Sequence, residues 1–267
     1  MNLRDKVIVI TGAASGIGAG LAQRFAAEQP RAIVLSDLPA QQSGLEAVAA
    51  ELSAAGDAAP ETVIHPADVG VEADVQALTA AALTRFGRVD LFCSNAGIIR
   101  DGTEHAPDSE WNLNFQVHVM AHLYAARAVV PSMIAAGGGY LLNTASAAGL
   151  ITSLPSATYA VSKHAAIALA EYLSISHGDD GVRVSVLCPQ AVATPMISGR
   201  AGSMAAANDG VISAQDLADC VVKGLADEKF LILPHADVLT YFQRKAADYD
   251  RWLGGMRRFA KRLRGTA

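Results

Sequence analysis

Seven short runs of aliphatic and β-branched residues alternate with longer segments of helical periodicity, and this alternation limits the possible folds more than any other feature. The runs are continuously apolar, which is typical of strands covered on both faces. Strict strand–helix alternation predicts parallel strands joined by right-handed crossovers. The expected strands are residues 6–11, 32–36, 62–66, 89–93, 139–144, 182–187 and 229–233, and the expected helices are 16–29, 41–55, 72–86, 108–135, 157–176, 214–226 and 237–263.

These elements predict a single doubly wound α/β fold, a parallel sheet of about seven strands with helices on both faces. Of the 267 residues, 51% are hydrophobic and 18% charged, which allows a sizeable core and argues against disorder. We find no internal repeat and no linker that divides the chain. The segment 199–210 has no periodicity, so a mobile loop is expected there.

Targeting and redox signals are weak throughout the chain. No stretch approaches the roughly 18 apolar residues that span a bilayer, and the apolar run after Lys6 is too short for the core of a signal peptide. The three cysteines, Cys93, Cys188 and Cys220, have no metal-binding or redox spacing. These features favour a cytoplasmic protein with buried, inert thiols and no metal site.

Three glycines follow the first expected strand at its junction with a helix. Gly12, Gly16 and Gly18 have the spacing Gly-x-x-x-Gly-x-Gly. Without side chains, the backbone can approach a phosphate, and the helix N-terminus adds partial positive charge. Tight turns also use glycine, so the loop alone does not establish a nucleotide site.

An acidic residue downstream supports the nucleotide interpretation. Asp37 ends the second expected strand, 19 residues after Gly18. A carboxylate there accepts hydrogen bonds from an adenosine ribose and repels a 2′-phosphate. No arginine or lysine occupies positions 36–38. The sequence therefore favours NAD over NADP.

Further motifs stand in a fixed order along the chain. They are TGAASGIG at 11–18, ADV at 67–69, SNAG at 94–97, Ser146 within NTASAAG, and YAVSK at 159–163. Together, with Tyr159 13 residues after Ser146, they resemble the short-chain dehydrogenase/reductase family. The resemblance extends from residue 6 to about 197 and implies a Rossmann-type domain, a nicotinamide cofactor, and a homodimer or homotetramer.

The resemblance also implies roles for individual residues. Asp68 and Val69 would flank the adenine, and residues 95–97 would line the ribose and ring. The segment from Pro189 to Thr194 would hold the nicotinamide carboxamide. The implied cofactor-binding residues are Gly12, Ser15, Gly16, Ile17, Gly18, Asp37, Asp68, Val69, Asn95, Ala96, Gly97, Tyr159, Lys163, Pro189, Val192 and Thr194, and the catalytic residues are Ser146, Tyr159, Lys163 and His118.

Tyr159 and Lys163 lie four residues apart, which places them on one face of a helix. A free phenol has a pKa of about 10 and is a poor base near neutrality. A positive charge at ~4 Å in an effective dielectric of ~20 stabilises tyrosinate by ~4 kcal/mol, about three pKa units. We therefore expect Lys163 to lower the pKa of Tyr159 so that the phenol acts as a general acid/base, with Ser146 orienting the reacting oxygen.

Two positions depart from the pattern of the family. His118 stands where family members commonly have an asparagine that holds a bend in the helix and a water linked to the lysine. Imidazole exchanges protons near neutrality, so His118 is expected to act as a relay or as a tolerated substitution; loss of activity is the alternative. Gln190 replaces a usual glycine, and either shapes the substrate pocket or points outward. We expect His122, one turn after His118, to face solvent within helix packing rather than to bind metal.

The charge of the chain is divided unevenly. Residues 243–267 hold eight Lys and Arg against two acids, a net charge of +6, so the remaining residues carry −11 of the total of −5. The tail also shows an apolar helical stripe. We expect residues 1–235 to form the dinucleotide-binding and catalytic domain and 236–267 a basic amphipathic extension of it. The extension docks on the body or a partner subunit, lies on an anionic membrane surface, or is simply solvated; docking is the favoured alternative. The acidic body disfavours nucleic acid.

Three functions are compatible with these features. The favoured one is an NAD-dependent dehydrogenase that interconverts a secondary alcohol and a ketone. The mainly apolar segments 98–103, 150–154 and 196–204, with only Arg100 and Arg200 as arginines, favour a lipophilic substrate. The alternatives are a catalytically weak NAD-binding module that acts through association, and an NADP-dependent carbonyl reductase.

Overall fold

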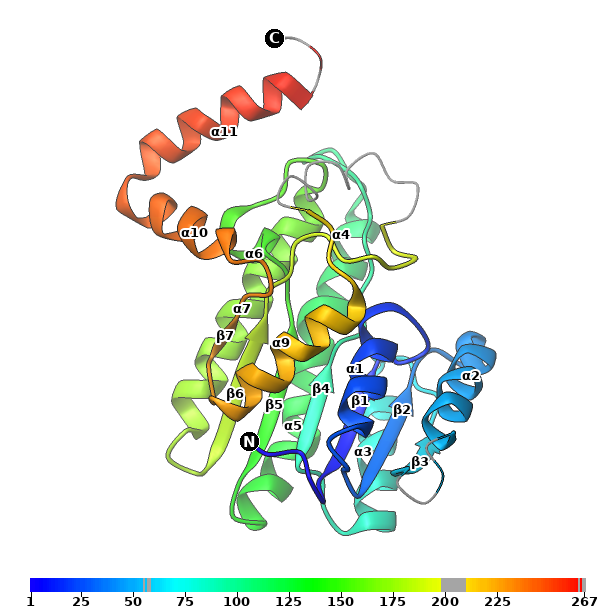
Figure 1. Ribbon diagram of the computed structural model, residues 1–267. Helices are drawn as coiled ribbons and strands as arrows, with labels where there is room; N and C mark the ends of the chain where they lie inside the picture. Colours follow the sequence, from blue (N-terminus) through cyan, green and yellow to red (C-terminus); the bar gives the residue numbers. More distant parts are fainter. Residues whose placement is uncertain (55, 57–58, 198–209, 264, 266–267) are drawn as a thin grey trace.

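Parallel strands form the centre of the molecule in the computed structural model, which describes residues 1–267 except 55, 57–58, 198–209, 264 and 266–267 (Figure 1). Within this part of the chain the sheet has seven strands in the order β3-β2-β1-β4-β5-β6-β7. All its pairings are parallel. The strands are β1 (Val7–Thr11), β2 (Ala32–Ser36), β3 (Glu61–Ile64), β4 (Leu91–Ser94), β5 (Gly139–Thr144), β6 (Val182–Leu187) and β7 (Leu231–Ile232).

Helices cover both faces of the sheet and complete a three-layer architecture (Figure 1). One face packs against α1 (Gly16–Ala26), α2 (Gln42–Ser53) and α9 (Ala214–Ala226). The other face packs against α3 (Glu72–Phe86), α5 (Ala121–Ala135) and α7 (Ala157–His177). Because every residue of β1 and β2 is buried, the continuous apolar runs mark doubly covered strands, as expected. The predicted fold class is confirmed.

The helix expected over 108–135 is interrupted. It consists of α4 (Asp108–Phe115), a π-helical turn η3 (Gln116–Met120) and α5. A π turn adds one residue to a helical turn and is frequent at functional sites. His118 lies in the middle of this turn and is completely buried.

The helix expected over 237–263 is also two helices, α10 (Asp237–Ala247) and α11 (Tyr249–Leu263). Asp248 breaks the helix because its backbone is extended, and its carboxylate accepts a hydrogen bond from the Arg251 N–H at 2.9 Å. α11 has no buried residue and extends away from the body (Figure 1). α10 docks on the body as expected for the tail, since its Val238 and Lys245 are buried. The expected docking on the body is not seen for α11.

Four smaller features complete the description. The short 3-10 turn η1 (Pro39–Gln41) follows β2, and α6 (Ala148–Ile151), which the sequence did not predict, follows Ser146. Of the cysteines, Cys220 is exposed, contrary to expectation. Among the described residues, no helix has the length and apolar character needed to cross a membrane.

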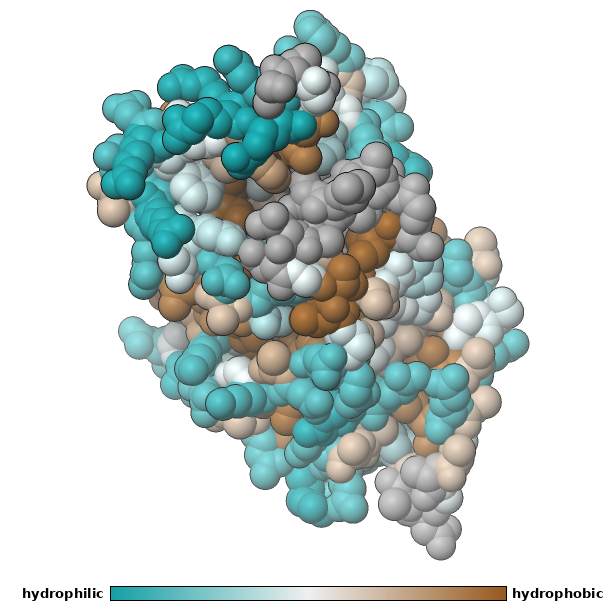
Figure 2. Space-filling model, turned by 45° about the horizontal axis from the view of Figure 1, so that its top comes forward, coloured by the Kyte–Doolittle hydropathy of each residue, from teal (hydrophilic) through white to brown (hydrophobic). Residues whose placement is uncertain are grey.

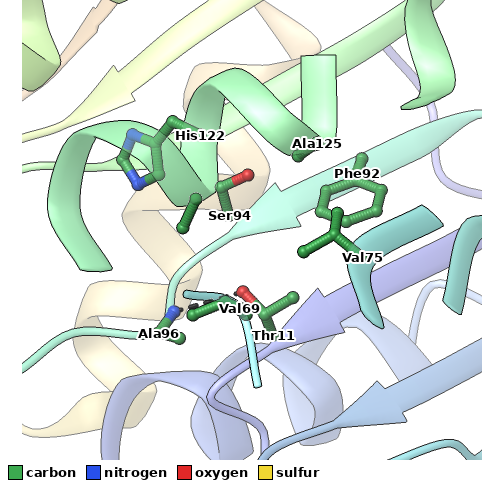
Figure 3. A pocket seen from close by; sticks show the side chains of 9 residues that line it. Thr11, Val69, Val75, Phe92, Ser94, Ala96, His122 and Ala125 are labelled. Carbon is green, nitrogen blue, oxygen red and sulfur yellow. Dashed lines mark hydrogen bonds between the residues drawn. The ribbon is translucent and has the colours of Figure 1, made fainter. Parts of the chain in front are cut away.

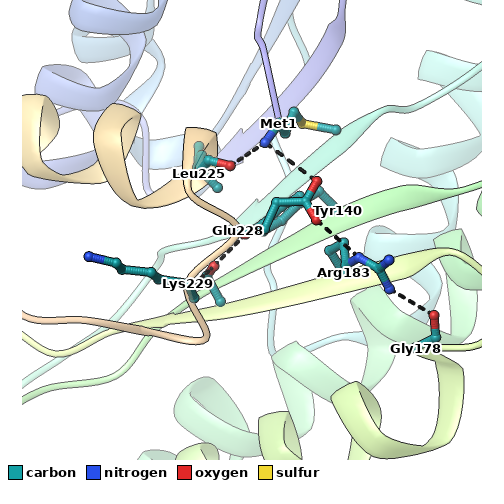
Figure 4. Close-up of polar contacts among 8 residues, drawn as sticks. Met1, Tyr140, Gly178, Arg183, Leu225, Glu228 and Lys229 are labelled. Atoms are coloured by element: carbon teal, nitrogen blue, oxygen red, sulfur yellow. Dashed lines mark hydrogen bonds and ion pairs between the residues drawn. The ribbon is translucent and has the colours of Figure 1, made fainter.

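Polar contacts link the segments that surround the amino ends of the strands (Figure 4). The Met1 ammonium group contacts the Leu225 carbonyl and pairs with Glu228. Glu228 also accepts a hydrogen bond from Arg183 at 3.2 Å, and Arg183 donates to the Gly178 carbonyl at 2.8 Å. These contacts fasten β6 and the α9–β7 connection far from the carboxyl ends of the strands, where the motif residues gather.

Candidate active site

The motifs meet at the carboxyl ends of four central strands. β1 leads into Gly12, β4 into Asn95, β5 into Ser146 and β6 into Pro189. β1 and β4 are neighbours in the sheet although two strands separate them in the sequence. This is a topological switch point, where open α/β sheets leave a crevice for a ligand.

The glycine turn leaves no room for side chains. Gly12 and Gly16 have φ angles of +68° and +55°, a region that favours glycine. A Cβ atom on Gly18 would lie 2.0 Å from the Gly12 carbonyl oxygen. The Ser15 side chain makes no capping hydrogen bond at the start of α1. A bare backbone turn with an uncapped helix N-terminus fits a pyrophosphate.

Two further candidate residues lie beside this turn. A Cβ atom on Gly16 would be 3.2 Å from Cγ2 of Thr194, so the segment after β6 reaches the glycine turn. Val192 is buried and forms an isolated bridge with Ile212. Ile17 packs against the core under α1. The structure thus brings residues 192–194 to the start of α1.

Asp37 also faces the glycine turn. Its carboxylate accepts hydrogen bonds from the N–H groups of Ala14 at 3.1 Å and Leu38 at 2.8 Å. The Asp37 carbonyl accepts from the Ala67 N–H at 2.9 Å, which places Asp68 and Val69 alongside. The acid is held at the end of β2, between the two segments that the sequence assigns to the adenosine.

Thr11 connects the glycine turn to residues 95–97. Its hydroxyl accepts hydrogen bonds from the N–H groups of Asn95 at 3.0 Å and Ala96 at 3.2 Å, and donates to the Cys93 carbonyl at 3.3 Å. The Thr144 hydroxyl donates to Asn95 Oδ1 at 3.1 Å. Sequence reasoning did not single out either threonine, although both stand inside the quoted motifs.

Ser146, Tyr159 and Lys163 come together next to the end of β5. Lys163 is buried, and its Nζ donates to the Thr144 carbonyl at 2.9 Å and lies 5.6 Å from the centre of the Tyr159 ring. The Ser146 hydroxyl lies close enough to the Tyr159 phenol to influence its pKa. Ser146 Oγ also accepts from the Ala148 N–H at 3.1 Å. Two hydroxyls and an amine therefore form one cluster at the crevice.

The pKa values within this cluster differ from the expectation. Burial has the largest effect on the pKa of Tyr159 and raises it, whereas the interaction with the Ser146 hydroxyl lowers it. Burial also lowers the pKa of Lys163 to about 7, because a low-dielectric environment disfavours the ammonium ion. The expected lowering of the Tyr159 pKa by Lys163 assumed a permanently charged lysine, and burial removes that assumption.

Pro189 and Gln190 lie on the opposite wall of the cluster. The Pro189 carbonyl accepts hydrogen bonds from the Ala147 N–H at 2.9 Å and the Ser146 hydroxyl at 3.4 Å. The Gln190 N–H donates to Nδ1 of His235 at 3.2 Å, and its Oε1 is buried without a partner among the described residues. The buried amide oxygen favours the pocket-shaping interpretation of Gln190 over the outward-facing one.

His122 does not face solvent, contrary to expectation. It is 2% exposed, and neither ring nitrogen has a hydrogen-bond partner in the described part of the chain. Burial lowers its pKa to about 3. The expectation was wrong because the π turn, which precedes His122, changes which side of the helix faces the sheet. Figure 3 shows the small cavity beside it, which is lined by Thr11, Val69, Val75, Phe92, Ser94, Ala96, Ala121, His122 and Ala125.

Comparison with known proteins agrees with this geometry. The family model described as short chain dehydrogenase matches residues 6–203. The chain belongs to the short chain dehydrogenase family. The resemblance seen in the motifs is confirmed, and as a member of this family the protein is an oxidoreductase that acts on a CH–OH group.

Two curated relatives illustrate the similarity. A 1-deoxy-11-beta-hydroxypentalenate dehydrogenase from Streptomyces avermitilis is 37% identical over 244 residues, covering 90% of this chain and 88% of the relative. A levodione reductase from Leifsonia aquatica is 35% identical over 196 residues, covering 72% of each protein.

A solved structure of the same family shares the fold over nearly its whole length. It is a short chain dehydrogenase/reductase from Burkholderia phymatum in complex with NAD, with a TM-score of 0.84 and 30% sequence identity. The superposition covers 94% of this chain and 96% of that chain.

Proposed function

We propose that the protein is an NAD-dependent dehydrogenase that interconverts a secondary alcohol and a ketone. The observation that carries the proposal is the cluster of Ser146, Tyr159 and Lys163 beside the glycine turn. A hydroxyl pair that can hold the substrate oxygen and exchange its proton lies next to a backbone cradle suited to a dinucleotide.

The residues around the crevice support NAD as the cofactor. The glycine turn holds the pyrophosphate, and Asp37 accepts hydrogen bonds from the adenosine ribose and disfavours a 2′-phosphate. Asp68 and Val69 border the adenine, residues 95–97 border the ribose and ring, and residues 189–194 hold the carboxamide. The similar Burkholderia phymatum protein was solved with NAD.

The chemistry is divided between cofactor and protein. Bound NAD supplies hydride transfer and, in its oxidised form, a positive charge that favours tyrosinate. Tyr159 exchanges the proton of the substrate oxygen, and Ser146 donates a hydrogen bond to that oxygen. Lys163 anchors the ribose, and because its pKa is about 7, its protonation changes near the working pH of a general acid/base.

Tyr159→Phe tests the proposal directly. We expect at least a hundred-fold loss of kcat with NAD binding retained, since general acid/base catalysis contributes roughly 10²–10⁴-fold. Production of NADH from a panel of alcohols measures turnover, and calorimetry measures NAD binding. Tyr172→Phe, an exposed tyrosine on the same helix, is the matched control. Equal turnover by the wild type and Tyr159→Phe would disprove the mechanism.

A lipophilic alcohol fits the surroundings best. Figure 2 shows hydrophobic side chains near the face onto which the carboxyl ends of the strands open, bordered by hydrophilic surface. Met196 and Val211 are 40% and 52% exposed. The two relatives described above are named for a hydroxypentalenate and for levodione. We expect kcat/KM to rise with the apolar surface of the alcohol, so that cyclohexanol is a better substrate than propan-2-ol; the opposite order would contradict this assignment.

The exposed surface and the cysteines support proposals for the assembly and the location of the protein. α7 presents Val161, Tyr172 and Ile175, which are 45%, 65% and 83% exposed. An apolar stripe of this kind is suited to a second copy of the chain, so we infer a homodimer or homotetramer.

The three cysteines are unpaired, in keeping with the reducing cytoplasm.

A further inference from the structure

His118 makes two hydrogen bonds with segments on either side of it. Its Nε2 lies 3.2 Å from the backbone nitrogen of Ile98, and its Nδ1 lies 2.9 Å from the Ser162 hydroxyl. The Ser162 hydroxyl lies 3.0 Å from the Tyr159 carbonyl oxygen. The imidazole is completely buried and meets the Tyr159 ring edge-on, with ring centres 5.3 Å apart.

These contacts determine where the protons are. A backbone N–H can only donate, so Nε2 of His118 must accept the hydrogen bond from Ile98 and carries no proton. In a neutral imidazole the proton is then on Nδ1, which donates to Ser162. The Ser162 hydroxyl is left to donate to the Tyr159 carbonyl. Each hydrogen bond of the chain therefore has one donor, one acceptor and a defined direction.

Protonation of the ring would break this arrangement. A proton on Nε2 would face the Ile98 N–H, so that two donors meet. Burial and the neighbouring Lys163 ammonium group both oppose the charge, and the pKa of His118 lies well below its usual value. The ring is therefore neutral and has no free nitrogen, which argues against the proton relay that the sequence suggested.

The residues joined by His118 belong to the two halves of the site. Ile98 directly follows the segment 95–97, whereas Ser162 stands between Tyr159 and Lys163 on α7. A Cβ atom on Gly97 would be 3.7 Å from His118 Nε2 and 3.8 Å from Lys163 Nζ. The cofactor-side loop, the imidazole and the catalytic lysine thus converge on one point.

We propose that His118 is a positioning residue that clamps the 95–98 loop to the catalytic helix through the chain Ile98 N–H, His118, Ser162 and the Tyr159 carbonyl. The clamp rests on the proposed dehydrogenase function and fixes the distance between the loop beside the cofactor and the tyrosine.

Two variants break the chain at different links. His118→Phe keeps an aromatic ring against Tyr159 but removes both hydrogen bonds of the imidazole, and Ser162→Ala removes the two hydrogen bonds of the Ser162 hydroxyl while keeping the one between Ile98 and His118. Since a net hydrogen bond contributes about 1 kcal/mol, we expect kcat/KM to fall roughly three- to thirty-fold in each. The KM for NAD should rise, and the apparent pKa values of the kcat profile should stay in place. The double variant should be no worse than His118→Phe.

The loop has a second attachment that protects the fold in these variants. The Ser156 hydroxyl contacts the Arg100 carbonyl, and the Ala157 N–H donates to the Gly102 carbonyl at 2.8 Å. Ser176→Ala, an exposed site on the same helix, is the control for Ser162→Ala. Thermal unfolding confirms that each variant is folded before its kinetics are compared.

A spectroscopic measurement tests the clamp without any turnover. Nitrogen-15 NMR of labelled imidazoles, with His118 assigned by its loss in His118→Phe, should show a ring that is protonated at Nδ1 and stays neutral well below pH 6.5. An Nε2-protonated ring, or titration near pH 6.5, would overturn the clamp. The clamp would also be overturned if an apparent pKa of the kcat profile moved by about one unit in His118→Phe and stayed unchanged in Ser162→Ala. Absence of turnover on all alcohols in the wild type would instead refute the proposed function and leave the NMR result standing.

Discussion

Lys163, a catalytic residue in the proposed function, illustrates how burial of a charged group opposes stability. Its ammonium group is buried and has one carbonyl partner, the Thr144 oxygen. A pKa of about 7 in the folded protein compares with about 10.4 in an unfolded chain. The unfolded chain therefore binds more protons between these values, and the free energy of unfolding should rise with pH from about 7 to about 10.4. Below about pH 7 the cost of burial is constant.

Lys163→Met should expose this cost. We expect the variant to lose dehydrogenase activity and yet to gain roughly 2 kcal/mol in free energy of unfolding at pH 7, because no charge is desolvated. The gain should shrink toward pH 10. Urea unfolding at both pH values measures the difference, with the exposed Lys223→Met as control. An equal change at both pH values would show that the charge of Lys163 is not responsible.

The burial of His122 makes the free energy of unfolding depend on pH in the acidic range. Its pKa is about 3 when folded and about 6.5 when unfolded, so the stability that depends on a neutral ring is lost as the pH falls from about 6.5 toward 3. Between pH 7 and pH 5 the free energy of unfolding of His122→Leu should fall by about 2 kcal/mol less than that of the wild type. Denaturant titrations at the two pH values measure this. The exposed His105→Leu serves as control, and parallel losses in His122→Leu and the wild type would contradict the prediction.

Among the elements, the strands and the two broken helices show what a sequence pattern can and cannot predict. All seven strands overlap the apolar runs that predicted them. In β1 and β2 burial on both faces leaves a direct imprint on composition. The interruptions at 116–120 and at Asp248 leave no such imprint. A π turn depends on which partners a buried side chain finds, and His118 finds them in Ile98 and Ser162, which are distant in the sequence.

α10 is attached to the segment after Ser146 by Lys245. Nζ of this residue donates to the Leu150 carbonyl at 2.6 Å and lies 3.4 Å from Nε2 of His164. Only 9% of Lys245 is exposed. The helix therefore supports α6, which forms one side of the substrate region in the proposed function.

Lys245→Met should weaken this support. A hydrogen bond from a charged group is worth roughly 1.5–3 kcal/mol, so we expect KM for the alcohol to rise about ten-fold while the Kd for NAD changes less than two-fold. Faster hydrogen exchange of residues 148–154 should accompany the change. Arg244→Met, its exposed neighbour, is the control; a variant of Lys245 with normal KM and normal exchange would rule out the attachment.

For the whole molecule, the position of the site follows from topology. The order of the strands brings β1 beside β4, and the motifs at their carboxyl ends meet without any long-range signal in the sequence. Motif order was therefore sufficient to predict which residues gather. It was not sufficient to predict protonation, because the pKa values of Tyr159, Lys163 and His118 depend on the depth at which the folded body buries them.

The exposed stripe on α7 predicts an assembly that one substitution can disrupt. Ile175→Lys places a charge on the most exposed apolar residue of the stripe, so the variant should sediment as a smaller species than the wild type at the same concentration. Analytical ultracentrifugation measures this. Leu38→Lys, an exposed leucine near the glycine turn, should leave the mass unchanged; a wild type that sediments as a monomer would refute the inferred assembly.

The helix α11 has a consequence for how the chain can evolve. Because no side chain of α11 is buried, its residues contribute little to the cooperative unfolding of the body, and substitutions there meet little resistance from folding. Selection can then alter the sign and number of charges on this arm without first compensating for lost stability. The basic character of the tail is therefore open to rapid adaptation, whereas the glycine turn and the clamp around His118 are not.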